Sequence, residues 1–179
     1  MLQFARRRRI ERETAGRIYA ACLAASRRPG FYVTYGVPDT LEGRFEMIGI
    51  ALFPVLNRLM NDPGDDPGLA RLVSESFVND MDAAFRELGL SDTALPKRMK
   101  ALYRSFAGRI GAYGEAIRTS EEALVTAIAR NVFPDAENPE SADALASYVR
   151  TCVAAVGKVD LQTLARGNVP FPPLQGEPA

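Results

Sequence analysis

The chain has 179 residues, of which 47% are hydrophobic and 25% are charged. These values are typical of one folded domain with its own core, and they exclude a disordered chain and a membrane-embedded body. The 22 basic residues balance the 22 acidic ones, which excludes the global positive field that draws whole proteins onto DNA.

The first predicted element is an amphipathic helix from Arg7 to Arg28, which Pro29 and Gly30 close. Its apolar positions recur at helical spacing, at Ile10, Ile18, Cys22 and Ala25. Its other face carries a basic N-terminal patch, formed by Arg6, Arg7, Arg8, Arg9, Arg12, Arg17, Arg27 and Arg28. This patch is either a solvated helix end or a contact surface for anionic lipid or ribosomal RNA. Glu11, Glu13 and the missing apolar run exclude an export signal, so we expect a cytoplasmic protein, with a peripheral position on the inner membrane as an alternative.

An aromatic, turn-rich connector from Gly30 to Pro38 leads into a second helix, for which Asp39 and Glu42 form the expected capping pair. Pro54 should kink this helix, because proline removes a backbone donor and clashes one turn back. Its apolar stripe is broad and makes it the expected central helix, with Leu41, Phe45, Ile48, Leu52, Val55, Leu56 and Leu59.

A solvated loop is predicted from Asn61 to Gly68, where two Pro-Gly steps occur. Pro67 fits the first turn of a third helix capped by Asp66, and Gly89 suits the left-handed position that ends it. A fourth helix is predicted from Pro96 to Arg118. The expected buried positions are Leu69, Leu72, Val73, Phe77, Met81, Ala84, Phe85 and Leu88 in the third helix, and Met99, Leu102, Phe106, Ile110, Tyr113 and Ile117 in the fourth.

Two further helices and a short helical turn complete the predicted fold. The fifth helix follows Ser120, the sixth runs from Asn138-Pro139-Glu140 to Gly157, and the turn lies around Leu161 and Leu164. Because only Phe31 to Val37 could form a strand, the sequence predicts an all-α, single-domain bundle of about six or seven helices over residues 1–168. A Pro-rich flexible tail is expected over residues 169–179.

Groups that carry out covalent chemistry are scarce in this chain. Histidine is absent, which excludes Ser-His and Cys-His catalytic pairs and histidine metal sites, and there is no Gly-rich phosphate loop. Cys22 and Cys152 lie in apolar stripes and are expected to be inert core thiols in a reducing compartment. Asp80 and Asp82 lie about 200° apart around a helix and are not expected to hold one metal ion. We therefore expect a binding protein that is not an enzyme and has no metal or cofactor.

The remaining charged residues predict contacts rather than catalysis. Asp82 should pair with Arg86 one turn on. Asp80 borders the apolar stripe and needs a partner, either Arg44 or a cation of the fourth helix as an internal ion pair, or a group on another protein. A second basic patch is formed by Lys97, Arg98, Lys100, Arg104 and Arg109, and it is either a solvated face or a binding surface.

Three short segments carry a family resemblance. RPGFY at 28–32 is followed by GVPDT at 36–40 and by GRFE at 43–46, and this order and spacing resemble the ubiquinol-cytochrome c chaperone family. FVNDMD at 77–82 and KRMK at 97–100 support the likeness, which covers about the first two thirds of the chain. The chain is most similar to bacterial members, which lack a long targeting extension.

The resemblance implies a chaperone that binds newly made cytochrome b, or another complex III subunit, and promotes assembly of the cytochrome bc1 complex. Mitochondrial relatives act near the ribosome and with a small partner protein, and the family offers no catalytic residues. Two alternatives stay open: a ribosome- or RNA-associated basic helical protein, and a helical protein that binds lipid or isoprenoid.

A surface for an apolar client would combine aromatic and basic residues. Phe31, Tyr32 and Tyr35 beside Arg27 and Arg28 would supply it, unless these aromatics only fill the core between helices. The expected partner-binding residues are Arg27, Arg28, Phe31, Tyr32, Tyr35, Asp39, Arg44, Glu46, Asp80, Asp82, Arg86, Lys97, Arg98, Lys100 and Arg104.

Overall fold

The structure is a computed structural model that describes residues 2–61, 66–134 and 139–177. Within these ranges the chain is helical and contains no strand. The helices are α1 (Leu2–Ser26), α2 (Pro29–Val33), α3 (Leu41–Asn61), α4 (Pro67–Glu87), α5 (Leu95–Thr119), α6 (Glu121–Val132), α7 (Pro139–Lys158) and α8 (Leu161–Ala165). Six of them have 12 residues or more, and α2 and α8 have five each. The predicted all-α bundle is therefore confirmed.

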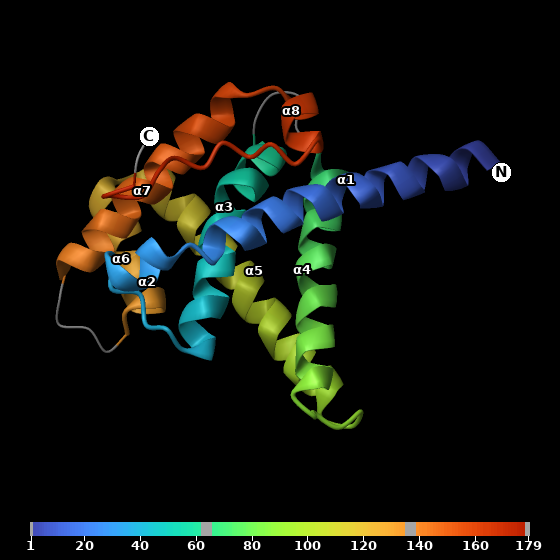
Figure 1. The fold of residues 1–179 in the computed structure, drawn as a ribbon, viewed down its shortest axis with the longest axis horizontal. Coiled ribbons are helices and arrows are strands. Elements are labelled where there is room, and N and C mark those ends of the chain that lie inside the picture. Colours follow the sequence, from blue (N-terminus) through green and yellow to red (C-terminus); the bar gives the residue numbers. More distant parts are fainter. Residues whose placement is uncertain (1, 62–65, 135–138, 178–179) are drawn as a thin grey trace.

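Helix α3 is the centre of the bundle, as its apolar stripe predicted. It contacts α1, α4, α5, α6 and α7, which surround it in Figure 1. Every residue from Glu46 to Leu56 is buried, so this part of the helix is enclosed on all sides rather than along one stripe. Pro54 lies within the continuous helix. Leu41, which was expected to be buried, is exposed because it lies at the first position of α3.

Local signals in the sequence set most helix ends. The Asp66 side chain accepts a hydrogen bond from the Leu69 backbone N–H (2.9 Å), and Ser120 accepts one from Ala123 (3.1 Å). Gly89 has φ +80° just after α4, as predicted for a residue that ends a helix in the left-handed region. The predicted loop at Asn61 to Gly68 and the predicted start at Asn138 fall mostly on 62–65 and 135–138, outside the described residues.

The expected Asp39–Glu42 capping pair is wrong. The Thr40 side chain instead accepts the hydrogen bond from the Gly43 backbone N–H (3.1 Å), and Asp39 accepts one from the Arg44 guanidinium (2.7 Å). Gly43 also has a steric reason to be glycine, because a Cβ there would overlap the Pro38 carbonyl oxygen. The turn at 36–40 therefore packs directly on the first turn of α3.

The aromatic connector contains a helix that periodicity did not predict. Helix α1 ends at Ser26, and Pro29 begins the single turn of α2. Phe31 is buried, and its ring packs against Tyr35 (5.8 Å between centroids) and Tyr148 (5.2 Å). This aromatic cluster attaches α2 to α7.

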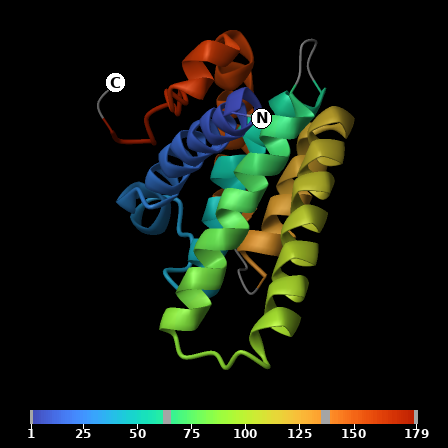
Figure 2. The ribbon, with the colours of Figure 1, turned by 90° about the vertical axis from the view of Figure 1, so that its right-hand side faces the viewer.

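Helices α4 and α5 form an antiparallel hairpin that extends beyond the rest of the bundle. Figure 2 shows them side by side, with their connecting loop at the lower end. The Phe77 and Phe106 rings stack between them, with centroids 4.4 Å apart. Residues of α4 and α5 and of the beginning of α3 line the groove described below.

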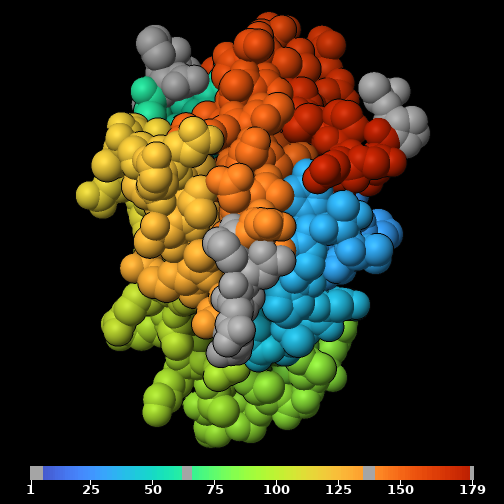
Figure 3. Space-filling view, turned by 90° about the vertical axis from the view of Figure 1, so that its left-hand side faces the viewer, coloured from blue at the N-terminus to red at the C-terminus, as the bar shows by residue number. Residues whose placement is uncertain are grey.

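Residues 169–177 pack on the body of the protein. Leu174 is 2% exposed, and Figure 3 shows this segment, in dark red, against α7 and the region of α2. The expectation of a loose tail therefore differs from what is seen for 169–177, while the division into a 1–168 domain and a tail stays a prediction.

Two further features bear on location and reactivity. None of the described helices combines the length and the apolarity needed to cross a membrane. Cys22 and Cys152 are both buried free thiols, and burial raises the pKa of Cys152 to about 12. These thiols are therefore protonated at neutral pH.

Candidate functional site

An open groove of about 800 Å³ lies between two groups of helices. One side is formed by the end of α1, by α2 and by the start of α3, and the other by the second half of α4 and the first half of α5. The side chains that line it come from residues 26–48, 81–85 and 98–109. Segments far apart in the sequence thus meet at one surface.

The groove has an apolar floor and an apolar rim. Phe45, Ile48, Met81, Phe85 and Leu102 line it and are buried or half-buried. On the rim, Val33 is 83% exposed and Leu41 is 61% exposed. Large exposed apolar side chains beside an apolar groove are typical of a surface that binds another molecule.

Six of the fifteen residues expected from the sequence to bind a partner line this groove. They are Arg27, Tyr32, Asp39, Arg44, Glu46 and Arg98. They come from α2, α3 and α5 and from the turns before α2 and α3. Four of them, Tyr32, Asp39, Arg44 and Glu46, lie in the three signature segments. The common surface gives a physical reason why residues of these separate motifs occur together.

A buried ion pair joins the two sides of the groove. Arg109 of α5 contacts the Glu46 carboxylate of α3 (2.6 Å), and the Glu46 side chain is only 6% exposed. Burial raises the pKa of Glu46, and the charge and hydrogen bond of Arg109 oppose that shift. The Arg109 guanidinium also lies 5.6 Å from the Phe45 ring centroid. This pair ties α3 to α5 at the groove.

The sequence did not predict this pair. Arg109 was assigned to the second basic patch, with Lys97, Arg98, Lys100 and Arg104, because those residues share one stretch of chain. In the structure Lys97, Lys100 and Arg104 are exposed on α5, whereas Arg109 lies one to three turns further on and faces α3. The signal in the sequence was Glu46, the acid of GRFE. A carboxylate on a central, buried helix needs a cation beside it.

Four arginines and three acids line the groove, which gives it a small excess of positive charge. Arg44 is paired with Asp39, and Arg109 with Glu46. Arg98 stacks over the Phe85 ring at 5.9 Å, and neither Arg98 nor Arg27 has an ion pair among the described residues. These two cations are therefore placed to meet an acidic group or the negative end of a helix.

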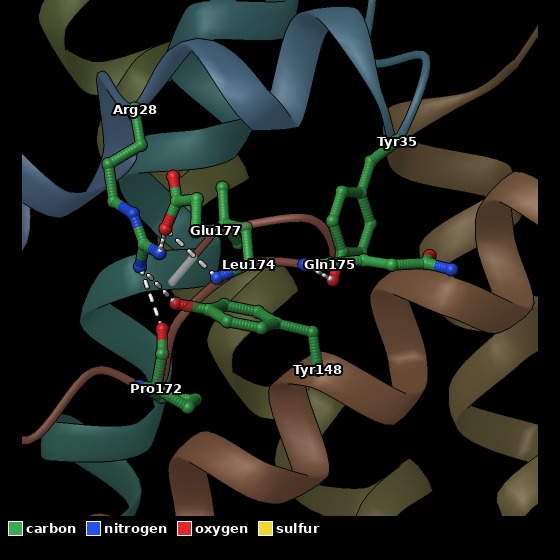
Figure 4. Close-up of polar contacts among 7 residues, drawn as sticks. All are labelled: Arg28, Tyr35, Tyr148, Pro172, Leu174, Gln175 and Glu177. Atoms are coloured by element: carbon green, nitrogen blue, oxygen red, sulfur yellow. Dashed lines mark hydrogen bonds and ion pairs between the residues drawn. The ribbon is translucent and has the colours of Figure 1, made fainter. Parts of the chain in front are cut away.

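Arg28, in contrast, is fully used inside the chain. Its guanidinium donates hydrogen bonds to the Pro172 carbonyl (2.8 Å), to the Tyr148 hydroxyl (3.2 Å) and to the Glu177 carboxylate. The Gln175 backbone N–H donates to the Tyr35 hydroxyl (3.4 Å). Figure 4 shows these contacts, which we call the clasp: residues 172–177 held by Arg28, Tyr35 and Tyr148.

The expected aromatic surface at 31–35 is only partly present. Phe31 and Tyr35 are buried in the core, so for them the alternative that they fill the space between helices is correct. Tyr32 is half-buried, lines the groove and donates its hydroxyl hydrogen to the Ser26 carbonyl (3.0 Å). Tyr32 is thus the single aromatic ring of α2 at the groove.

The two acids of α4 have different partners. Asp82 accepts a hydrogen bond from Arg86 (2.7 Å), as predicted. The ion pair expected for Asp80 with Arg44 or with a fourth-helix cation is wrong, because the Tyr19 hydroxyl of α1 donates to Asp80 instead (2.6 Å). None of these three α4 residues, Asp80, Asp82 or Arg86, lines the groove.

The basic N-terminal patch is partly neutralised within α1. Arg7 pairs with Glu11 (2.8 Å) and Arg9 with Glu13 (3.4 Å), and all four residues are largely exposed to solvent. Such exposed pairs contribute little to stability. These pairs therefore reduce the positive charge of the patch, and Arg28, its last member, is held in the clasp.

Comparison with known proteins gives one family. The model of the family described as ubiquinol-cytochrome C chaperone matches residues 33–171. Among curated proteins, the chain is 24% identical over 160 residues to ubiquinol-cytochrome-c reductase complex assembly factor 1 of Xenopus laevis, covering 88% of this chain and 80% of that protein. The human protein of that name is 23% identical over 160 residues, and the chain spans 54% of its length. The mouse protein is 24% identical over 135 residues, and the chain spans 46% of it.

One solved structure is also similar. It is the crystal structure of the Cbp3 homolog from Brucella abortus, which is 35% identical and superposes with a TM-score of 0.82. The likeness covers 96% of both chains.

Proposed function

Because the chain belongs to the ubiquinol-cytochrome C chaperone family, we propose that it binds newly made cytochrome b and promotes assembly of ubiquinol-cytochrome c reductase. The observation that carries this proposal is the groove, where residues of separate signature segments surround an apolar floor. The names of the curated relatives, which are assembly factors of that complex, support the same role. The proposal assigns the protein no catalytic step.

The chemistry of the groove suits an apolar helix of a membrane protein before its assembly. Val33 and Leu41 on the rim, with Phe45 on the floor, would bury apolar side chains that otherwise meet water. Arg27 and Arg98 would lie near the negatively polarised C-terminal end of that helix, or near an acidic residue that follows it. Cytochrome b is the client that the family resemblance implies.

The site of action in this proposal is the cytoplasmic face of the inner membrane. The exposed arginines of the N-terminal patch would contact anionic headgroups while the groove holds the client. A ribosome or a small partner protein could bind the same patch, and steep salt dependence of ribosome cosedimentation would identify the ribosomal contact.

The test uses the native host with the gene deleted and restored by variants. We expect loss of assembled cytochrome bc1 in the deletion strain, and failure of Val33→Gln/Leu41→Gln to restore it, because both side chains are exposed and their change leaves the fold intact. Ile10→Gln/Met60→Gln is the matched control, since these exposed apolar residues lie outside the groove and should restore assembly. Native gels and haem b absorbance measure the result, and normal cytochrome bc1 in the deletion strain would refute the proposal.

The groove also favours a second candidate, a lipid or isoprenoid chain as the ligand. A volume of about 800 Å³ lined mainly by apolar side chains is large enough for such a molecule. Native mass spectrometry of protein purified from its host separates the two. A stoichiometric lipid adduct that Val33→Gln/Leu41→Gln abolishes, together with normal cytochrome bc1 assembly, would favour this candidate over the client-binding role.

A further inference from the structure

Helix α2 belongs to the clasp and to the groove at the same time. Tyr32 and Val33, in its second half, line the groove. Arg28, which precedes its first residue, and Gly30, in its first half, contact the segment 172–177. The five residues of α2 therefore lie between the groove and the segment 172–177.

The contact with the clasp is close and specific. Leu174 is 2% exposed, and a Cβ on Gly30 would lie 2.7 Å from the Leu174 Cδ1 atom, so a larger residue at position 30 would displace this methyl group. The Glu177 carboxylate accepts hydrogen bonds from the Arg28 guanidinium and from the Leu174 backbone N–H (3.0 Å). Figure 4 shows Arg28 surrounded by the segment and the Tyr148 hydroxyl.

Helix α2 depends on such contacts for its position. A helix of one turn is not stable by itself, so tertiary packing must hold it. Phe31 anchors the inner side of α2 in the core, and the Thr34 and Tyr35 backbone N–H groups donate to the Gly30 carbonyl. The N-terminal end of α2 is held by the clasp.

The clasp itself has the features of a releasable contact. Most of its residues from 172 to 177 are exposed, with Leu174 as the buried anchor. The segment also lies beyond residues 33–171, the part of the chain that matches the family model. Segments with few buried contacts open at much lower free energy than the core.

We propose that the clasp regulates the groove: residues 172–177, when docked, fix α2 as one wall of the groove, and their release loosens that wall and weakens binding of the client. This regulation rests on the proposed function of the groove as the client site. A partner that captures the segment 172–177 would thereby promote release of the client.

The first measurement is amide hydrogen exchange on the full chain. Leu174→Gln places a polar amide in the buried anchor position. Glu177→Gln is a milder change that weakens the contacts of the carboxylate with Arg28 and with the Leu174 backbone N–H. We expect protection of the Thr34 and Tyr35 amides to fall by about tenfold in Leu174→Gln and by less in Glu177→Gln. Glu75→Gln, which breaks the exposed Arg71–Glu75 pair elsewhere, is the matched control and should change nothing there.

The second measurement follows the width of the groove without any client. Spin labels on Val33→Cys and Ala101→Cys report the distance between its two sides, because the native Cys22 and Cys152 are buried. We expect a broader distance distribution when Leu174→Gln or Glu177→Gln releases the segment. The proposal is overturned if residues 172–177 are released while hydrogen exchange at Thr34 and the spin-label distance distribution stay unchanged. If Leu174→Gln does not fold, Glu177→Gln decides by the same criterion.

The outcome separates this proposal from the proposed function. If the groove widens on release but deletion of the gene leaves cytochrome bc1 normal, the coupling of clasp and groove is supported and the proposed client is refuted. If the groove does not change on release but the protein is required for cytochrome bc1 assembly, only the coupling of clasp and groove is refuted.

Discussion

Similar residues on the two sides of α2 differ in their burial and in their interaction partners. On the clasp side, the guanidinium of Arg28 has three acceptors within the chain, and Phe31 and Tyr35 are buried. On the groove side, Arg27 has no ion pair among the described residues, and Val33 is almost fully exposed. Neighbouring positions thus have different roles; within α2, Phe31 and Val33 lie two residues apart and therefore on different sides of the helix. The clasp side is complete within this chain, whereas the groove side presents surface to another molecule.

The same contrast exists inside the groove. Oε2 of Glu46 and Nε of Arg109 are buried and have no hydrogen-bond partner among the described residues, although the two side chains contact each other. Polar groups left in this state reduce stability. The groove therefore carries an energetic cost that the clasp does not. Substitutions in the groove and in the clasp should change stability by different amounts and with different pH dependence.

The largest expected effect follows removal of the cation from the groove pair. Arg109→Met keeps an apolar stem but leaves the buried Glu46 carboxylate without its cation, so the free energy of unfolding should fall by about 3 kcal/mol at pH 7. Urea denaturation measures this loss. Arg104→Met, an exposed arginine of the same helix, is the control and should cost less than about 0.5 kcal/mol.

The pH dependence of this loss gives a second check. Burial already raises the pKa of Glu46, and without Arg109 the pKa should rise further. A carboxyl group with a raised pKa in the folded state contributes stability at low pH that is lost as the pH rises through that pKa. The deficit of Arg109→Met should therefore shrink on acidification, and a deficit that is constant with pH would contradict a buried, charged Glu46.

Local signals were enough to predict the longer helices, whose ends are set by nearby residues. The caps at Asp66 and Ser120 and the glycine after α4 act within three or four residues, so the sequence contains both partners. The helix α2 was missed because a single turn shows no periodicity. The cap of α3 was assigned to Asp39, since both Asp39 and Thr40 can cap a helix and only the backbone geometry selects one.

A medium effect should distinguish two glycines of α3. Gly43→Ala would place a Cβ on the Pro38 carbonyl oxygen, and we expect a net loss of about 2 kcal/mol after the gain in helix propensity is subtracted. Gly49→Ala meets no atom within 4 Å and should stabilise the protein by up to about 1 kcal/mol. Thermal unfolding of the two variants measures the difference, and equal effects would show that the turn at 36–40 does not pack tightly on α3.

The candidate site followed from the sequence only in part, because its contacts join distant segments. Six of the fifteen predicted partner-binding residues meet at the groove, and four of these six lie in the three signature segments. The partner of Asp80 lies 61 positions away at Tyr19, and that of Arg28 lies 149 positions away at Glu177. Neither pair has a signal in local spacing. Arg109 was placed with the exposed arginines since its inward direction depends on the packing of α5 against α3, which periodicity alone does not reveal.

The smallest expected effect is on the clasp, and it has the opposite pH dependence from the groove. Hydrogen bonds from Arg28 and from the Leu174 backbone N–H lower the pKa of the exposed Glu177 carboxyl. A lowered carboxyl pKa contributes stability above the ordinary glutamate pKa of about 4, and that contribution is lost as the pH falls through the lowered value. We therefore expect the amide signals of Leu174 and Gln175, followed by NMR between neutral and acidic pH, to shift toward the released state only at the acidic end. Glu177→Gln should show the released signals at neutral pH as well and no further change on acidification. If its titration matches that of the native chain, another carboxyl group closes the clasp, and the contrast between a self-contained clasp and an open groove would no longer rest on Arg28 and Glu177.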